Sequence, residues 1–148
     1  MIVRALARKD IPKVVKLARK LAEHVNGPDP KLTTEIVEEL ACGETRRFEA
    51  LVVEHNRGIV GFAAFTQNFE LHTNSSTIFL VSDLFVCDQI RKSGVGQALL
   101  EALHRVANDR KCGVIRFEVW QENEQARAFY AKHDAQAVDD VDLWQIAV

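Results

Sequence analysis

The stretch Gln89–Leu100, "QIRKSGVGQALL", decides how the second half of this chain is arranged. Two glycines, Gly94 and Gly96, follow a basic dipeptide, and apolar residues at helical spacing come directly after them. The preceding run "TIFLVSDLFVCD" (77–88) is rich in β-branched and aromatic residues, which indicates a central strand. We therefore predict a strand that passes through a tight turn into a helix.

The predicted turn has the composition of an anion-binding site. The first N–H groups of a helix have no partner within the helix and carry partial positive charge. Glycine at 94 and 96 lets an anion such as a phosphate approach the backbone, and Arg91 and Lys92 add full charges. The pattern also fits a plain tight turn with solvated basic side chains, because it completes neither a Walker A loop nor a GxGxxG motif. Spacing alone leaves both explanations open.

Outward from this stretch, hydrophobic periodicity and turn residues predict the other elements. Strands are predicted at 2–6, 48–54, 59–67, 113–120 and 142–148, and helices at 11–25, 33–41 and 122–133. The hairpin around His55–Gly58 makes the first half of the sheet antiparallel, and the later strand–helix–strand units favour parallel pairing. The predicted fold class is α/β: a single domain over residues 1–148, with a mixed, mostly antiparallel twisted sheet flanked by helices.

Composition and charge argue against several classes of protein. A chain of 148 residues, 47% hydrophobic and 27% charged, has the size and composition of one globular domain. Its net charge of −2 argues against nucleic-acid binding, and no apolar run approaches the roughly 18 residues of a membrane span. Cys42, Cys87 and Cys112 match no metal-ligand spacing, so we expect reduced cysteines and no metal. With no signal region at the N-terminus, the expected compartment is the cytoplasm.

Three motifs carry a resemblance to a known family. Arg91–Gly96, "RKSGVG", matches the R/Q-x-x-G-x-G/A signature of the GNAT superfamily of acyl-CoA-dependent N-acetyltransferases. "DLFV" (83–86) resembles the strand that leads into that signature, and "NEQARAFYAKHDA" (123–135) resembles the family's N-x-x-A/S-x-x-F-Y helix. Within the superfamily, nearly the whole chain is most similar to the spermidine/spermine (diamine) acetyltransferase-like group. The resemblance implies the GNAT fold.

The resemblance also implies acetyl-CoA as cosubstrate. The amides of Lys92–Gln97 would hold the pyrophosphate of coenzyme A, and the pantetheine arm would pair with the backbone of Leu84–Val86. A free N–H in that strand would stabilise the oxyanion that forms when an amine attacks the thioester. The cofactor-binding residues so implied are Leu84, Phe85, Val86, Arg91, Lys92, Ser93, Gly94, Val95, Gly96, Gln97, Asn123 and Ala126.

The second motif helix supplies the predicted acid. Tyr130, the only tyrosine of the chain, would protonate the leaving thiolate, although a core aromatic with a polar tip is the alternative. Asn123 would hydrogen-bond the pantetheine, and a helix N-cap is the alternative or a joint role. The small side chain of Ala126 would let the cosubstrate approach.

Asp83 is the predicted base for the attacking amine, acting directly or through water. Because residues alternate sides along a strand, this carboxylate could also face away from the cleft. Weaker candidates are Glu118 and Glu70, and His24 and His72 lie near predicted substrate loops. Trp120 and Trp144 are interpreted as core or interface residues, and not as a substrate platform.

The sequence departs from the group it resembles at the substrate end. Ser82 stands where polyamine acetyltransferases tend to carry a second acid, and "EHVNG" (23–27) lacks a further expected acid. Asp134 replaces a glycine that usually ends the Tyr-bearing helix, a position that favours the left-handed conformation.

Two hypotheses follow for the function. The first is direct transfer of an acetyl group from acetyl-CoA to a primary amine of a small molecule; the alternative is a catalytically degenerate acyl-CoA-binding module with a sensing or scaffold role. The acceptor would be chosen by the loops His24–Leu32 and Asn68–Ser76. The resemblance further implies a homodimer, through the apolar C-terminal run 142–148.

Overall fold

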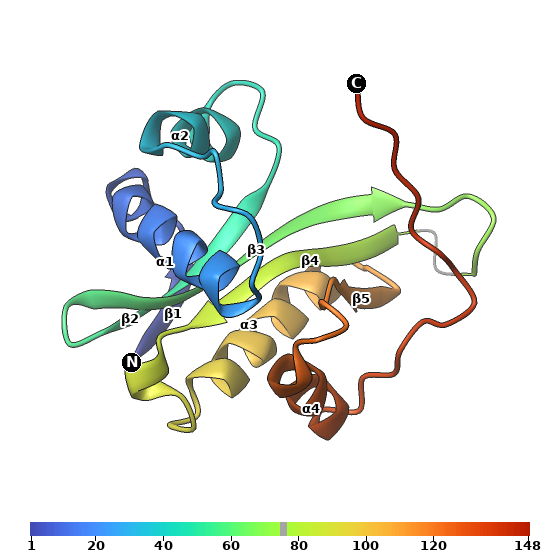
Figure 1. Cartoon of the computed structure of the whole chain (residues 1–148). Helices are drawn as coiled ribbons and strands as arrows, with labels where there is room; N and C mark the ends of the chain where they lie inside the picture. The colour runs from blue at the N-terminus through green and yellow to red at the C-terminus, as the bar shows by residue number, and fades with distance from the viewer. Residues whose placement is uncertain (75–76) are drawn as a thin grey trace. The chain divides into compact units, whose positions relative to one another are not determined.

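The computed structural model describes residues 1–74 and 77–148 (Figure 1). The chain forms two compact units, Met1–Glu118 and Val119–Val148. The first unit holds a five-stranded sheet in the order β1-β2-β3-β4-β5. The elements of the first unit are β1 (Ile2–Ala5), the 3-10 turn η1 (Arg8–Asp10), α1 (Ile11–His24), α2 (Thr34–Cys42), β2 (Glu49–His55), β3 (Gly58–Phe69), β4 (Thr77–Val86), η2 (Asp88–Ile90), α3 (Val95–Asp109) and β5 (Val114–Phe117).

The sheet is mixed, as predicted. Strands β1 to β4 pair antiparallel with their neighbours, and β5 pairs parallel with β4. The β2–β3 hairpin turns at Asn56 and Arg57, which have φ of 48° and 63°. Two successive residues with positive φ give a type I′ turn, whose twist matches that of the strands it joins.

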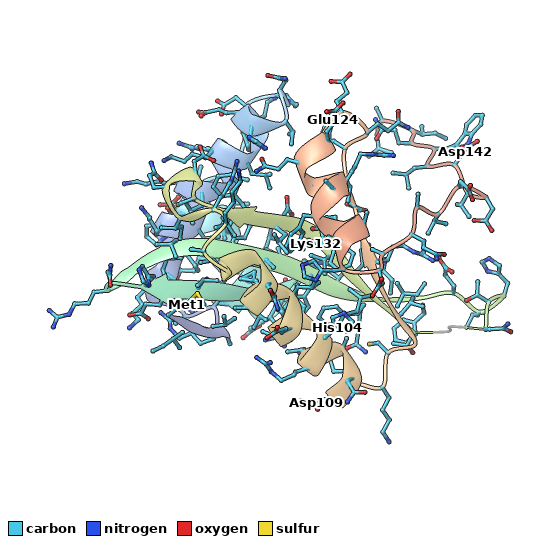
Figure 2. All side chains as sticks on the ribbon, turned by 90° about the horizontal axis from the view of Figure 1, so that it is seen from below. Met1, His104, Asp109, Glu124, Lys132 and Asp142 are labelled. Carbon is cyan, nitrogen blue, oxygen red and sulfur yellow. The ribbon has the colours of Figure 1, made fainter. Side chains whose placement is uncertain are left out.

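The two faces of the sheet are covered by different helices, which lie on opposite sides of the strands (Figures 1 and 2). The face that we call the α3 face packs against Leu99 and Leu103 of α3, whose C-terminal half runs from His104 to Asp109 in Figure 2. The opposite face, which we call the α1 face, packs against Val14 and Leu17 of α1. Apolar residues alternate between these faces along β2, β3 and β4, as expected for strands between two layers of helix.

The start of α1 rests on a buried carboxylate. Asp10 holds the N-cap position, but its side chain does not bond the first turn of α1. It accepts hydrogen bonds from the guanidinium of Arg4, at 2.7 and 3.0 Å, and from the N–H of Ala7 at 2.8 Å. The hydrogen bonds from Arg4 are the main reason why the pKa of Asp10 is lowered. This carboxylate therefore ties α1 to β1.

The second unit contains α4 (Glu124–Lys132), whose two ends are labelled in Figure 2. The predicted final strand over 142–148 is wrong, because Asp142–Val148 has no strand structure. A strand needs a neighbour for its backbone hydrogen bonds, and in this segment Leu143, Trp144 and Ile146 are all about nine-tenths exposed. The strand predicted at 113–120 forms only over Val114–Phe117.

Candidate functional site

The glycine stretch forms the predicted turn between a strand and a helix. Lys92 and Gly94 adopt the left-handed conformation, with φ of 65° and 82°, and the hydroxyl of Ser93 donates to the carbonyl oxygen of Ile90 at 2.5 Å. Gly94 is the N-cap of α3 and makes no side-chain capping bond. The first intrahelical bond runs from the N–H of Ala98 to the carbonyl oxygen of Gly94, at 3.0 Å.

Three N–H groups at the start of α3 consequently have no partner in the helix. They belong to Val95, Gly96 and Gln97, all of which were predicted to bind the pyrophosphate. The position of the Cβ that Gly94 lacks is open, with no described atom within 4 Å. The positive end of a 15-residue helix and an open approach to its backbone are the features that an anion requires.

Arg91 lies beside this turn and is held by contacts with β4 and η2. Its Nε donates to the carbonyl oxygen of Val86 at 3.0 Å, its Nη1 pairs with the carboxylate of Asp88 at 2.8 Å, and its guanidinium lies 5.4 Å from the ring centre of Phe85. These contacts fasten the turn to the end of β4, while Asp88 offsets part of the charge. The neighbouring Lys92 is exposed.

The end of β4 has one open edge. The β4–β5 pairing begins at Ile78↔Val114 and ends at Val81↔Phe117, followed by a hydrogen bond from the N–H of Glu118 to the carbonyl oxygen of Val81 (3.1 Å). On the other side, pairing with β3 continues to Val86. Within residues 1–74 and 77–148, no strand pairs with Leu84–Val86 on the β5 side, so this edge is open to a ligand apart from the Val86 carbonyl, which accepts from Arg91.

A β-bulge in β4 decides where Asp83 lies. Phe65 faces Val81 and Ala64 faces Asp83, so Ser82 is an extra residue without an opposite partner on β3. Asp83 therefore shares the α1 face with Ala64, and it is exposed there, with the Ser82 hydroxyl at 2.9 Å from its Oδ2. The sequence could not tell which face this carboxylate takes, because only the bulge fixes it.

In the second unit, Asn123 caps α4. Its Oδ1 accepts a hydrogen bond from the N–H of Ala126 at 3.0 Å, which confirms the capping role; the predicted pantetheine contact stays a prediction. Ala126 is half-buried. Asp134 has a φ of 62°, the left-handed conformation expected just beyond this helix.

Tyr130 lies one turn after Ala126 on α4. Its ring meets that of Phe129 edge-on, with the ring centres 5.3 Å apart. Burial raises the pKa of the phenol above its ordinary value of 10. Because desolvation disfavours the phenolate, the group keeps its proton at neutral pH.

The weaker candidates differ in their surroundings. Glu118 and His24 are exposed, and Glu70 pairs with Arg116 on β5, an ion pair that no local sequence pattern predicts. Trp120 and Trp144 are 59% and 89% exposed, so neither is a core residue, and their place in an interface stays a prediction. Of the predicted acceptor loop 68–76, Ser75 and Ser76 lie outside the described residues.

The cysteines and the acidic and histidine side chains form no further centre in the part of the chain that the structure describes. Cys42, Cys87 and Cys112 are free thiols. No group of three metal-ligating side chains occurs among the described residues. No helix within residues 1–74 and 77–148 is long and apolar enough to cross a membrane.

Comparisons with known proteins agree with this arrangement. The acetyltransferase (GNAT) domain model matches residues 46–134. The thialysine N-epsilon-acetyltransferase of Bos taurus is 24% identical over 153 residues, which cover 97% of this chain and 89% of that protein. In fold, a Bacillus halodurans protein of known structure matches with a TM-score of 0.81 and 23% identity, over 99% of this chain and 100% of the other. An aminoglycoside N-acetyltransferase in complex with CoA matches with a TM-score of 0.80 and 16% identity, over 99% and 95%.

Proposed function

Because this chain belongs to the GNAT acetyltransferase family, we propose that it transfers an acetyl group from acetyl-CoA directly to a primary amine of a small molecule. The observation that carries the proposal is the open edge of β4 leading into the three unpartnered N–H groups of α3. The free N–H groups at a helix start can bind a pyrophosphate, and an open strand edge can pair with an extended, amide-bearing arm. A relative that acetylates thialysine and a fold neighbour bound to CoA support the same chemistry.

The proposed reaction needs no acyl-enzyme. Asp83 takes a proton from the ammonium form of the acceptor, directly or through water, and the freed amine attacks the thioester carbonyl carbon. A backbone N–H of Leu84–Val86 stabilises the oxyanion, and the C–S bond then breaks. Tyr130 gives its proton to the departing thiolate, and the second proton that the nitrogen loses on becoming an amide returns to the phenol through water. The raised pKa of Tyr130 supports this role because the phenol is protonated before the reaction.

Binding and turnover test this proposal separately. Calorimetric titration with acetyl-CoA and CoA, with ATP as a control, should show binding of the first two only. An amine screen by release of free thiol should cover diamines, lysine-like amino acids and aminoglycosides. Binding of acetyl-CoA without turnover of any amine would favour the degenerate acyl-CoA-binding module, and absence of binding would contradict both functions.

A matched pair of variants tests the location of the cosubstrate. Lys92→Gln removes the exposed charge beside the α3 N-terminus, and Lys13→Gln removes an equally exposed charge on α1. We expect the first to weaken CoA binding several-fold and the second to leave it unchanged, because charge assists phosphate binding only at short range. Equal effects would contradict a pyrophosphate site at this turn.

We also infer a homodimer formed through the C-terminal segment, in the cytoplasm. The support for the dimer is the exposed apolar side chains of Leu143, Trp144 and Ile146, which a second copy would cover. The free thiols support a reducing compartment. Light scattering should give a dimer mass for the chain and a monomer mass for the Leu143→Asp/Ile146→Asp variant; a monomeric parent chain would contradict the inference.

A further inference from the structure

The ion pair between Arg116 and Glu70 has no part in the proposed acetyl transfer. Arg116 is in the middle of β5, and Glu70 follows the last residue of β3. Nη1 and Oε1 are 2.6 Å apart, and the two side chains are 38% and 27% exposed. The hydrogen bond from Arg116 is the main cause of the lowered pKa of Glu70, so the carboxylate is charged at neutral pH. A solute can therefore reach a fixed pair of opposite charges here.

This pair lies on the same face of the sheet as Asp83. Arg116 is the register partner of Leu80, and Leu80 faces Thr66. Counting along β4 without a bulge would place Leu80 and Asp83 on opposite faces, since they are three residues apart. Because Ser82 is an extra residue, Asp83 lies on the α1 face, as Leu80 does. Arg116 and the proposed base Asp83 therefore share one face of the sheet.

The separation of these positions fits one particular kind of acceptor. Because Ser82 bulges, the step from Leu80 to Asp83 matches only the two residues from Thr66 to Ala64 on β3, which correspond to roughly 7 Å along the sheet. This is of the order of the distance that separates the side-chain amine of a lysine-like amino acid from its α-carbon substituents, across a four-carbon stem. Hydroxyl and amide side chains of Thr66 and Asn68 lie on the same face, joined by a hydrogen bond of 3.2 Å. Asn68 and Thr66 face Ile78 and Leu80, so these polar side chains lie at the end of the face that carries the ion pair.

The charges of the pair complement an α-amino acid. A guanidinium binds a carboxylate through two parallel hydrogen bonds, and a carboxylate binds an ammonium. When a zwitterionic head group enters between Arg116 and Glu70, its carboxylate pairs with the guanidinium and its ammonium pairs with the Glu70 carboxylate. Two ion pairs then replace one, and no charge is left unpaired. Half-exposed ion pairs contribute little to stability, so opening this one is not a large obstacle. A diamine has no carboxylate and would bring a second cation toward the guanidinium.

Resting on the proposed function, we propose that Arg116 and Glu70 hold the α-carboxylate and α-ammonium of an amino acid, whose side-chain amine receives the acetyl group. The pair is a specificity determinant: it selects lysine-like amino acids over diamines of the same length. The transfer itself is unchanged, with a new C–N bond to the side-chain nitrogen and the thiolate of CoA as leaving group.

The test compares L-lysine and thialysine with cadaverine, which is lysine without its carboxylate. We expect the unmodified enzyme to prefer the amino acids at least tenfold in kcat/KM. Arg116→Gln should abolish that preference through a raised KM, with kcat and the Kd for acetyl-CoA nearly unchanged. Arg116→Lys should restore part of the preference, and Arg105→Gln, at an exposed position of α3, should keep all of it.

Each outcome separates this inference from the proposed function. If Arg116→Gln lowers kcat/KM equally for the amino acid and the diamine, or for neither, the role of the ion pair is overturned while acetyl transfer stands. Turnover of diamines or aminoglycosides with no turnover of amino acids has the same meaning. No acetyl-CoA binding in the unmodified chain overturns both. A thermal unfolding midpoint unchanged in Arg116→Gln excludes misfolding as the cause of a lost preference.

Discussion

The two halves of β4 have different tasks. Residues 78–81 are paired with β3 on one edge and with β5 on the other, whereas Leu84–Val86 are paired with β3 alone. The first half has its polar backbone satisfied within the sheet, and the second half keeps an edge for a ligand. Ser82, the bulged residue, marks the boundary. One part of this strand therefore stabilises the fold, and the other part is free to bind the cosubstrate of the proposed reaction.

The largest expected effect is the loss of stability in Phe79→Ala, a change in the half of β4 that is paired on both edges, here called the closed half. Phe79 is fully buried on the α3 face and stacks on Phe65, with ring centres 4.5 Å apart. Loss of a buried phenylalanine leaves a cavity and costs about 3–5 kcal/mol. Denaturant unfolding measures the change. A loss below about 1 kcal/mol would mean that the closed half does not carry the stability assigned to it.

Directly before the open half, Asp83→Asn should reduce kcat and leave the fold intact. Loss of a general base lowers rates by about 10²-fold or more, whereas an exposed carboxylate contributes within about 0.5 kcal/mol to unfolding. Steady-state kinetics and denaturant unfolding on the same sample check both statements. Asp109→Asn, at the exposed end of α3, is the control and should change neither. An unchanged kcat in Asp83→Asn would remove the base from the mechanism.

Local chemistry made most of the fold predictable. The positive-φ turn at Asn56 and Arg57, the Thr33 cap of α2 and the glycine turn before α3 all depend on residues close together in the sequence. The division within β4 does not, because the bulge at Ser82 depends on the register with β3. Register is a property of two strands, so one strand's pattern cannot reveal it.

The errors concern residues whose partners lie far away in the chain or are absent from it. Arg116 and Glu70 are separated by 46 positions, and nothing local to either predicts the pair. Asp142–Val148 has an apolar composition typical of a strand, but a strand forms only beside another. The same limit applies to Trp144. Its apolar side chain predicted burial, but it is exposed in a single copy of the chain.

A smaller effect is expected at the turn that follows the open half. Gly94→Ala places a side chain at a φ of 82°, where L-residues pay roughly 1–2 kcal/mol. The free energy of unfolding should fall by that amount. The affinity for CoA should also fall, because the added Cβ lies at the approach to the first amides of α3. Gly27→Ala is the control: its Cβ would make only ordinary contacts, 3.5 Å or longer, and stability should be retained. Unchanged CoA affinity in Gly94→Ala would break the link between this turn and the open edge.

The smallest effect concerns the proton that the departing thiolate must receive. Tyr130 is the only tyrosine, so phenolate absorbance reports on this residue alone. Burial raises its pKa in the folded chain above 10, so the native phenol should titrate at higher pH than the same phenol in denatured chain. Titration of the native protein near pH 10 would contradict the burial and weaken the case for a permanently protonated acid.

The same shift has a consequence for alkaline stability. A native group that holds its proton more tightly than the unfolded one stabilises the fold fully below the unfolded pKa of about 10, and this contribution is lost as pH rises through the folded pKa. Between about pH 9 and 11, the free energy of unfolding should fall more steeply for the unmodified chain than for Tyr130→Phe. Lysines titrate in the same range, but equally in both proteins, so they cancel in the difference. Parallel curves would show that Tyr130 ionises alike in both states, and the acid for the reaction at the open half of β4 would then have to be sought elsewhere.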